Sequence, residues 1–271
     1  MISCTTAVVL AAGVGSRMRR DNGGASLTPE QAAAASLGIK GMIPDSRGRP
    51  FLDHVLGSLV EAGIESVVLV VGTSHDLIRN HYTTTPPHHL TIEFVVQPAP
   101  RGTADAVLAV EPVIRDREFL VLNADNLYSR ASLDALVALG SPGLVAFDRE
   151  HLIRNSNIEA ERIASFAILT LGPGNVLRGI IEKPSLIDLA AAESRWISMN
   201  LWRFDREIFA ACRDVALSPR GELELPIAVG LAVDRGAVLQ AIPSTEGVLD
   251  LSSRADVAHV ARQLGDRELR L

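Results

Sequence analysis

The chain has 271 residues, of which 47% are hydrophobic and 21% are charged, and its formal net charge at pH 7 is −6. This composition excludes a disordered chain, and the length suits one main domain with a large core. Basic residues stand singly rather than in runs, so we expect a small-molecule ligand and no nucleic-acid partner.

The two cysteines, Cys4 and Cys212, lie far apart and form no CxxC or Cys/His pattern, which predicts neither a disulfide framework nor a zinc site. Reduced thiols are typical of cytoplasmic proteins, and we expect that location. The first apolar run, TTAVVLAAG, is too short to cross a bilayer, so we predict a buried strand and no membrane contact.

Apolar, β-branched runs of strand length alternate with helical patterns in the first half of the chain. Because these runs are apolar on both faces, the alternation predicts an α/β sandwich with a covered parallel sheet through about residue 147. We expect strands at 7–11, 66–71, 92–96, 119–122 and 144–147, with helices at 51–62, 102–111 and 132–139.

Residues 19–38 form an unusual stretch directly after the first strand and its glycine loop. An Asn/Gly turn at 22–24 precedes Thr28, Pro29 and Gln31, which have the pattern of a helix start, and Gly38 would end that helix. The segment is either a surface insertion or a mobile lid over a bound phosphate group.

After residue 147 the pattern changes to a substrate-side extension. We expect strands at 163–170, 176–182 and 197–204, and helices near 205–212 and 224–234. Ser253 and Asp256 have capping-box spacing before a last amphipathic helix.

The strongest local motif is VVLAAGVGSRM, in which a strand leads into Gly13 and Gly15, with Arg17 beyond. Glycines let backbone N–H groups approach phosphate oxygens, and an arginine adds a forked donor. A dinucleotide site is disfavoured, because Met18 replaces the third glycine of GxGxxG.

With five further motifs in order, this loop resembles the opening of the sugar-phosphate nucleotidyltransferases, which include glucose-1-phosphate thymidylyl- and uridylyltransferases and the N-acetylglucosamine-1-phosphate uridylyltransferase domain. The resemblance implies a three-layer, glycosyltransferase-A-like fold with a mixed, mostly parallel sheet. It also implies one domain over 1–271, with nucleotide-binding, acceptor-binding and metal-site parts at about 1–147, 148–247 and 248–271. The further motifs are QPAPRGTADAV, FLVLNADNLY, IIEKP, SMNLWRF and VLDLSSRADV.

The resemblance assigns roles to charged residues near the triphosphate. Asp125 and Asp250 match the aspartates that hold Mg²⁺, the expected cofactor, since hard cations prefer carboxylate oxygens. Arg17 and Lys40 match the cations that contact the phosphates. Ile39 stands where the family usually has proline, and the 22 residues between Arg17 and Lys40 exceed the family's usual span.

For the base, the resemblance implies one wall from the backbone of the first strand end and another from Gln97 and a turn. The Gln97 amide offers a donor and an acceptor, which suits a pyrimidine edge, and UTP or dTTP is favoured by the resemblance. The wall residues are Leu10, Ala11, Ala12 and Gly13, and the turn residues are Gly102 and Thr103.

On the acceptor side, Glu182 and Lys183 of EKP resemble residues that bind sugar hydroxyls and the attacking phosphate, and Asn200 resembles the asparagine that orients the sugar. The family often carries glycine in the strand before EKP, where Ala167 stands here. Trp196 and Trp202 are expected in the core or an interface rather than framing the pocket.

The expected reaction joins a nucleoside triphosphate to a sugar 1-phosphate and releases pyrophosphate. It needs no protein nucleophile, because the acceptor phosphate is already anionic. Two alternatives remain: transfer, for example from CTP, to a non-sugar acceptor such as a phosphonate, alcohol phosphate or aminocyclitol phosphate, and a non-catalytic sugar-nucleotide sensor. The sequence indicates no oligomeric state.

Overall fold

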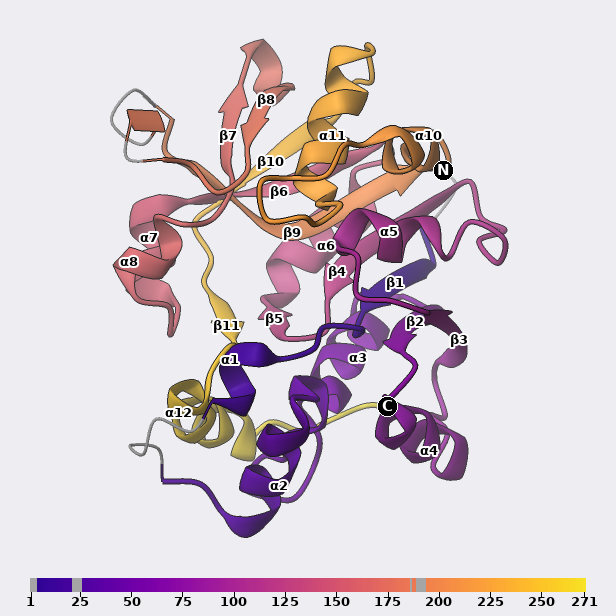
Figure 1. Cartoon of the computed structure of the whole chain (residues 1–271), viewed down its shortest axis with the longest axis vertical. Coiled ribbons are helices and arrows are strands. Elements are labelled where there is room, and N and C mark those ends of the chain that lie inside the picture. The colour runs from indigo at the N-terminus through magenta and orange to yellow at the C-terminus, as the bar shows by residue number, and fades with distance from the viewer. Residues whose placement is uncertain (1–3, 21–25, 186, 189–193) are drawn as a thin grey trace.

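The five strands predicted in the first half are present, and four of them form a parallel core. In this computed structural model, which describes residues 4–20, 26–185, 187–188 and 194–271, the strands β4, β1, β2 and β3 are parallel neighbours in that order (Figure 1). Their bounds are β1 Thr6–Leu10, β2 Ser66–Gly72, β3 Thr91–Gln97 and β4 Glu118–Asn123.

The sheet is covered on both faces, and the side-chain alternation of β1 shows how. Ala7 and Val9 belong to one buried cluster, whereas Val8, between them, belongs to another on the opposite face. Residues of α3, α6 and α12 contribute to the first cluster, and residues of α5, α10 and α11 to the second. The predicted three-layer α/β arrangement is therefore confirmed.

The helices of the first half agree with the sequence patterns within a few residues. Those predicted are α3 (Phe51–Glu61), α5 (Thr103–Leu108) and α6 (Arg130–Ala138), and α6 begins after Ser129, whose side chain caps it. The sequence analysis did not identify α4 (Asp76–Thr84), whose only buried side chains are Ile78 and Tyr82.

The second half of the chain completes the same sheet. The long strand β9 (Trp196–Asp205) lies between β4 and β6 (Gly143–Asp148) and is antiparallel to both. At the edge, β10 (Gln240–Ser244), which the sequence analysis did not identify, pairs in parallel with β6. Among the described residues the sheet has nine strands, and it is mixed, with a parallel part formed by β3, β2, β1 and β4.

One predicted strand is wrong at its start. Residues 163–167 were expected to be extended, but α8 (Ala160–Ile163) occupies the beginning of that stretch, and β7 (Ile168–Leu171) starts only afterwards. The cause is tertiary, because ion pairs from Arg162 hold this helical turn against the C-terminal segment. A hairpin then joins β7 to β8 (Leu177–Ile181) through the 3₁₀ turn η2 (Pro173–Asn175).

The remaining helices lie close to their predicted places. These are α10 (Ile208–Asp214), α11 (Leu225–Asp234) and α12 (Arg254–Gly265), while α7 (Arg149–Asn155) was not predicted. The predicted capping box of Ser253 and Asp256 starts α12. Within the described part of the chain, none of the helices has both the length and the apolar content that crossing a membrane requires.

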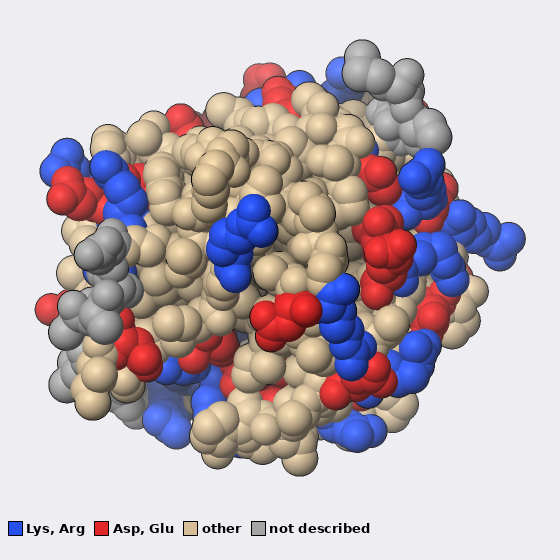
Figure 2. All heavy atoms as spheres, turned by 90° about the horizontal axis from the view of Figure 1, so that it is seen from above, with Lys and Arg blue, Asp and Glu red and all other residues tan. Residues whose placement is uncertain are grey.

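Charged side chains of both signs alternate around the face seen from above in Figure 1, which carries β7, β8 and α11. The part of that face above the middle of the view is largely uncharged, while basic and acidic side chains stand near the middle (Figure 2). This view therefore offers no extended basic surface of the kind that binds a polyanion.

Candidate active site

The glycine loop after β1 is shaped by one close backbone contact. Gly15 lies in the left-handed region (φ 59°), directly before α1 (Ser16–Arg19), and a Cβ added there would lie 2.1 Å from the Gly38 carbonyl oxygen. Gly38 is itself left-handed, with φ 73°. Only glycine permits this approach of two backbone segments, so the loop and the residues before Lys40 hold each other in place.

The insertion after this loop is anchored over its described part. The predicted helix is α2 (Pro29–Leu37), with a capping box between Thr28 and Gln31 and Gly38 as its C-cap. The Gln31 side chain donates to the Pro44 carbonyl at 3.0 Å, and the Arg19 guanidinium donates to the Leu37 carbonyl. The predicted turn at 22–24 lies outside the described residues.

These contacts tie the described part of the insertion to α1 and to the segment before α3. Ala34 and Ala35 of α2 are buried, although the helix is alanine-rich and has little stability of its own. Tertiary packing therefore supplies the order of the helix, and the short 3₁₀ turn η1 (Lys40–Met42) follows directly from it.

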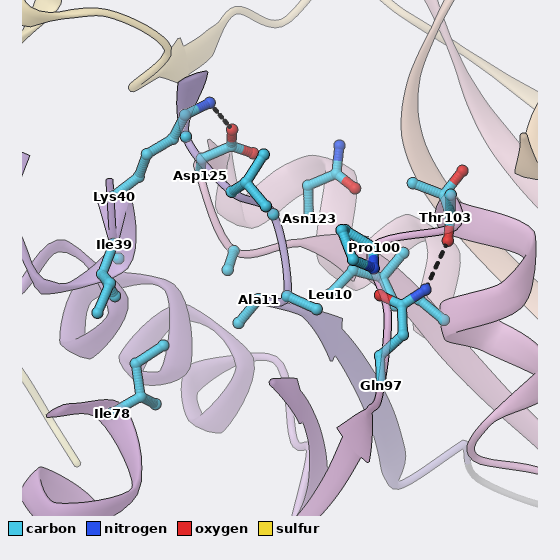
Figure 3. A pocket seen from close by; sticks show the side chains of 18 of the residues that line it. Leu10, Ala11, Ile39, Lys40, Ile78, Gln97, Pro100, Thr103, Asn123 and Asp125 are labelled. Atoms are coloured by element: carbon cyan, nitrogen blue, oxygen red, sulfur yellow. Dashed lines mark hydrogen bonds and ion pairs between the residues drawn. The ribbon is translucent and has the colours of Figure 1, made fainter. Parts of the chain in front are cut away.

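The first pocket, of about 310 Å³, opens at the carboxyl ends of the parallel strands. This is the edge at which open α/β sheets bind ligands. Its walls include every residue predicted to bind the nucleotide: Leu10, Ala11, Ala12, Gly13, Gly15, Gln97, Gly102 and Thr103 (Figure 3).

The side-chain amide of Gln97 is held in one orientation. Its nitrogen donates to the Gly102 carbonyl at 3.0 Å and to the Asp105 carboxylate at 2.7 Å. Because both partners are acceptors, the amide nitrogen must face them, which leaves the carbonyl oxygen for a ligand. Gln97 was expected to offer a base both a donor and an acceptor. In the structure its amide nitrogen already donates to Gly102 and Asp105, so only the acceptor is available to a ligand.

The turn at Gly102 and Thr103 is braced by a segment that the sequence analysis did not assign to the site. Leu223 donates to the Arg101 carbonyl at 2.7 Å and accepts from the Ala104 amide at 2.8 Å. Gly102 has φ 123°, and a Cβ there would lie 2.3 Å from the Leu223 carbonyl oxygen. Residues 220–224, between α10 and α11, therefore fix this wall of the first pocket, and Glu222 lines the pocket.

A second pocket, of about 150 Å³, adjoins the first, and an irregularity of β9 creates it. Leu144 of β6 pairs with Trp202, but Ala146 pairs with Ser198, so β9 has two extra residues between these positions. Such a bulge re-aims side chains, and here Asn200 takes φ 57° and lines the pocket. The Trp202 indole donates to the Asn200 side-chain oxygen at 3.3 Å.

The two tryptophans lie as expected, away from the cavities. Trp202 is fully buried and stacks on Phe204, while Trp196 packs under the Arg195 guanidinium. Neither is among the residues lining the two pockets.

The EKP segment contributes a carboxylate and a cation to the second pocket, which Ala167 also lines. Lys183 has φ 50°, and its ammonium donates to the Ser165 carbonyl at 3.1 Å. Burial, and then a hydrogen bond with Glu224, raises the pKa of Glu182 to about 7. Glu182 and Glu224 therefore form a carboxyl pair beside the pocket.

The two pockets meet at a single ion pair. Lys40, Asn123 and Asp125 line both cavities, and the Lys40 ammonium lies 2.6 Å from the Asp125 carboxylate (Figure 3). Arg17 reaches the second pocket and makes no hydrogen bond or ion pair with another described residue. A ligand that fills the first pocket therefore presents its end to Lys40, Asp125 and the second pocket.

A small ribbon brings Asp250 to Asp125. The strands β5 (Asn126–Tyr128) and β11 (Val248–Asp250) are antiparallel, with Asp250 opposite Asn126. The Asn126 amide donates to the Asp250 carboxylate at 2.8 Å. Burial, and then the Asp125 charge, raises the pKa of Asp250, so the two carboxylates lie close enough to interact.

The donor set at this junction fits a hard cation. Asp125 and Asp250 both line the second pocket, and their carboxylates, with the amide and hydroxyl groups of Asn123, Asn126 and Ser252, offer oxygen ligands. Such sites suit Mg²⁺ better than a softer metal ion. Among the described residues no cluster of three His, Cys, Asp or Glu side chains forms a metal site, so the remaining ligands would be substrate oxygens or water.

The structure thus brings every predicted site residue to one of two adjoining cavities. It also adds pocket residues that the sequence analysis missed: Asn123, Asn126, Phe166, Ser198, Glu222 and Ser252. Asn123 carried a usable signal, because it is a polar residue at a strand end. Phe166 lies between α8 and β7, and the others reach the pockets through the bulge, the ribbon and the loop before α11.

Comparison with known proteins agrees with this arrangement. Residues 6–253 match the nucleotidyl transferase family, and the chain belongs to that family. A UTP–glucose-1-phosphate uridylyltransferase, AglF, of Haloferax volcanii is 29% identical over 250 residues, which cover 92% of each chain.

Other similar proteins differ in length or in sequence. The bifunctional protein GlmU of Methanococcus maripaludis is 28% identical over 197 residues, and the match spans 73% of this chain but only 42% of that relative. A UDP-glucose pyrophosphorylase solved with UDP-glucose has the same fold, with a TM-score of 0.75 at 17% identity, over 98% of this chain and 100% of that chain.

Proposed function

We propose that the protein transfers a nucleotidyl group from a nucleoside triphosphate to a sugar 1-phosphate, with magnesium, and releases pyrophosphate. One observation supports this most: two cavities share Lys40, Asn123 and Asp125, so two ligands would meet there. Adjoining sites convert a two-substrate reaction into one between positioned groups. The activities named for the similar proteins agree with this assignment.

In this scheme the first pocket holds the base and ribose. The Gln97 carbonyl oxygen is the polar group free to meet the base, and it can accept from the N3–H of uracil or thymine. The ring nitrogen N3 of cytosine is an acceptor and would face it unfavourably. The pocket therefore favours UTP or dTTP over CTP.

The phosphates would extend along the glycine loop toward Lys40. Arg17 and Lys40 would supply positive charge where the leaving pyrophosphate gains negative charge. Asp125 and Asp250 would hold the magnesium ion, which supplies charge neutralisation on the phosphates when it is bound. The chain itself orients the groups and needs no nucleophilic side chain.

The acceptor would lie in the second pocket with its phosphate toward Lys183. Glu182 and Asn200 would hold sugar hydroxyl groups, since a carboxylate and an amide both accept from them. An oxygen of the acceptor phosphate forms a bond to the α-phosphorus. The bond between that phosphorus and the oxygen bridging to the β-phosphate breaks, and pyrophosphate leaves with the electron pair.

A matrix of triphosphates and acceptors tests the proposal. Pyrophosphate release is measured for UTP, dTTP, CTP and ATP, each with glucose 1-phosphate, N-acetylglucosamine 1-phosphate, phosphocholine and an inositol phosphate, and products are identified by mass spectrometry. We expect UTP or dTTP with a sugar 1-phosphate to give the fastest release. Fastest turnover of CTP with a non-sugar acceptor would overturn the acceptor assignment, and binding without release in every pair would indicate a sensor.

A further inference from the structure

A second cation stands at the proposed metal site. Arg162 of α8 forms an ion pair with the Asp250 carboxylate through one guanidinium nitrogen and lies 3.3 Å from Asp256 through the other. Its side chain is 22% exposed, and its Nε is buried without a hydrogen-bond partner. Arg162 lies outside the family motifs recognised in the sequence.

The position of Asp256 shows that Arg162 is directed toward Asp250. One Asp256 oxygen accepts from the backbone amides of Ser252 and Ser253 and from the Ser253 hydroxyl, which completes the cap of α12. The other oxygen faces Arg162. Asp256 is therefore a fixed anchor, and it holds the guanidinium against Asp250.

Each of the two proposed metal carboxylates thus has its own basic side chain. Lys40 pairs with Asp125, and Arg162 pairs with Asp250. These four formal charges sum to zero. A buried carboxylate needs such a counter-charge, but a cation on each carboxylate also opposes the approach of a divalent ion.

We infer that Arg162 is a positioning residue that makes the metal site depend on nucleotide: it neutralises Asp250 in the free protein, so that a divalent ion binds tightly only together with a triphosphate. This inference rests on the proposed function, in which Asp125 and Asp250 are metal ligands. The triphosphate supplies the negative charge that the four side chains lack. Arg162 yields Asp250 to the incoming ion and remains paired with Asp256.

The test measures Mn²⁺ binding by electron paramagnetic resonance, with and without the non-reactive α,β-methylene analogue of UTP. Without the analogue, we expect R162Q and R162M to bind Mn²⁺ at least about tenfold more tightly than the wild type, because a nearby unit charge is removed. R162K, which keeps the charge, should resemble the wild type. R154Q removes an exposed arginine of α7 that pairs with Glu150, and it is the matched control.

Two outcomes separate this inference from the proposed function. If R162Q and R162M fold, as judged by circular dichroism, but bind Mn²⁺ alone no more tightly than R162K, the role of Arg162 is wrong. If D250N binds Mn²⁺ with the analogue as tightly as the wild type does, Asp250 is not a metal ligand, and the metal assignment itself fails.

Discussion

The two pockets of this protein are built in different ways. The nucleotide pocket lies where parallel strands end, and most of its walls come from segments directly after β1, β3 and β4. The acceptor pocket depends on a bulge in β9, on left-handed residues at Lys183 and Asn200, and on a ribbon that joins residues 126 and 250.

The position of the nucleotide pocket follows from the topology of the sheet, whereas the acceptor pocket depends on local distortions of the backbone. Carboxyl ends of parallel strands always share an edge, so the first pocket follows from the order of the strands. The second requires backbone conformations that cost free energy and persist only because surrounding contacts impose them. We therefore expect substitutions in the two pockets to affect different kinetic constants.

The largest effect should come from the junction that both pockets share. D125N and D250N are each expected to lower turnover about 100-fold or more at saturating magnesium, because a carboxylate contributes several kcal/mol of charge stabilisation through the ion. Initial rates of pyrophosphate release measure this. The control is D134N on α6, which removes an exposed carboxylate paired with Arg130. Turnover within threefold of the wild type for either junction variant would contradict the assignment.

The nucleotide pocket should be sensitive at Gly102. G102A places a Cβ against the Leu223 carbonyl, so the turn must shift, and we expect the KM for the triphosphate to rise by about tenfold with little change in the KM for the acceptor. G63A is the matched control, since Gly63 also has positive φ but a Cβ there meets nothing within 4 Å. Equal changes in both KM values for G102A would show that the two pockets are not independent.

An effect of similar size is expected in base selection. Q97A removes the carbonyl oxygen that faces the base and frees the Asp105 carboxylate that now holds the amide. Loss of one good polar contact costs about 1–3 kcal/mol, so the preference for UTP or dTTP over CTP should fall by about tenfold. Ratios of kcat/KM measure this preference, and an unchanged ratio would remove Gln97 from base recognition.

The acceptor pocket should show the weakest effect, and it should appear as a pH dependence of stability. Because the folded protein raises the pKa of Glu182 from 4.5 to about 7, the protonated carboxyl is favoured on folding. Its contribution to the free energy of unfolding is complete below about pH 4.5 and is lost as the pH rises through about 7. The free energy of unfolding in urea should therefore fall in the wild type relative to that of E182Q as the pH rises from 5 to 8.

The matched control for this measurement is E161Q, which changes an exposed glutamate of α8. Its difference from the wild type should stay flat over the same range. If the difference in the free energy of unfolding between the wild type and E182Q is also independent of pH, the pKa of Glu182 is not raised in the folded protein.

The predictability of the fold follows the same division. Strands such as β1 and β4 were located because both of their faces are buried and their apolar runs are continuous. The edge strand β10 escaped notice because it contains Pro243 and buries only Ala241 and Ser244. The helix α8 was mistaken for part of a strand because Arg162 holds it through partners about 90 residues away. Local patterns cannot encode such long-range ion pairs.

The candidate site was predictable to the extent that short motifs follow strands. Asp125 and Gln97 stand at strand ends, and the fold brings them to one edge. The Leu223 brace and the carboxyl pair of Glu182 with Glu224 could not be foreseen, because they join loops whose distance in space depends on β9 and α11.

The central claim is that an oxygen of the acceptor phosphate attacks the α-phosphorus of a nucleotide in the adjoining pocket. Glucose 1-phosphate labelled with ¹⁸O at its three non-bridging phosphate oxygens tests this with unlabelled UTP and mass spectrometry. We predict that all three labelled oxygens appear in the nucleotide sugar and none in pyrophosphate. Labelled pyrophosphate would contradict this prediction. So would release of pyrophosphate together with a nucleotide that carries neither glucose nor label as the only other product.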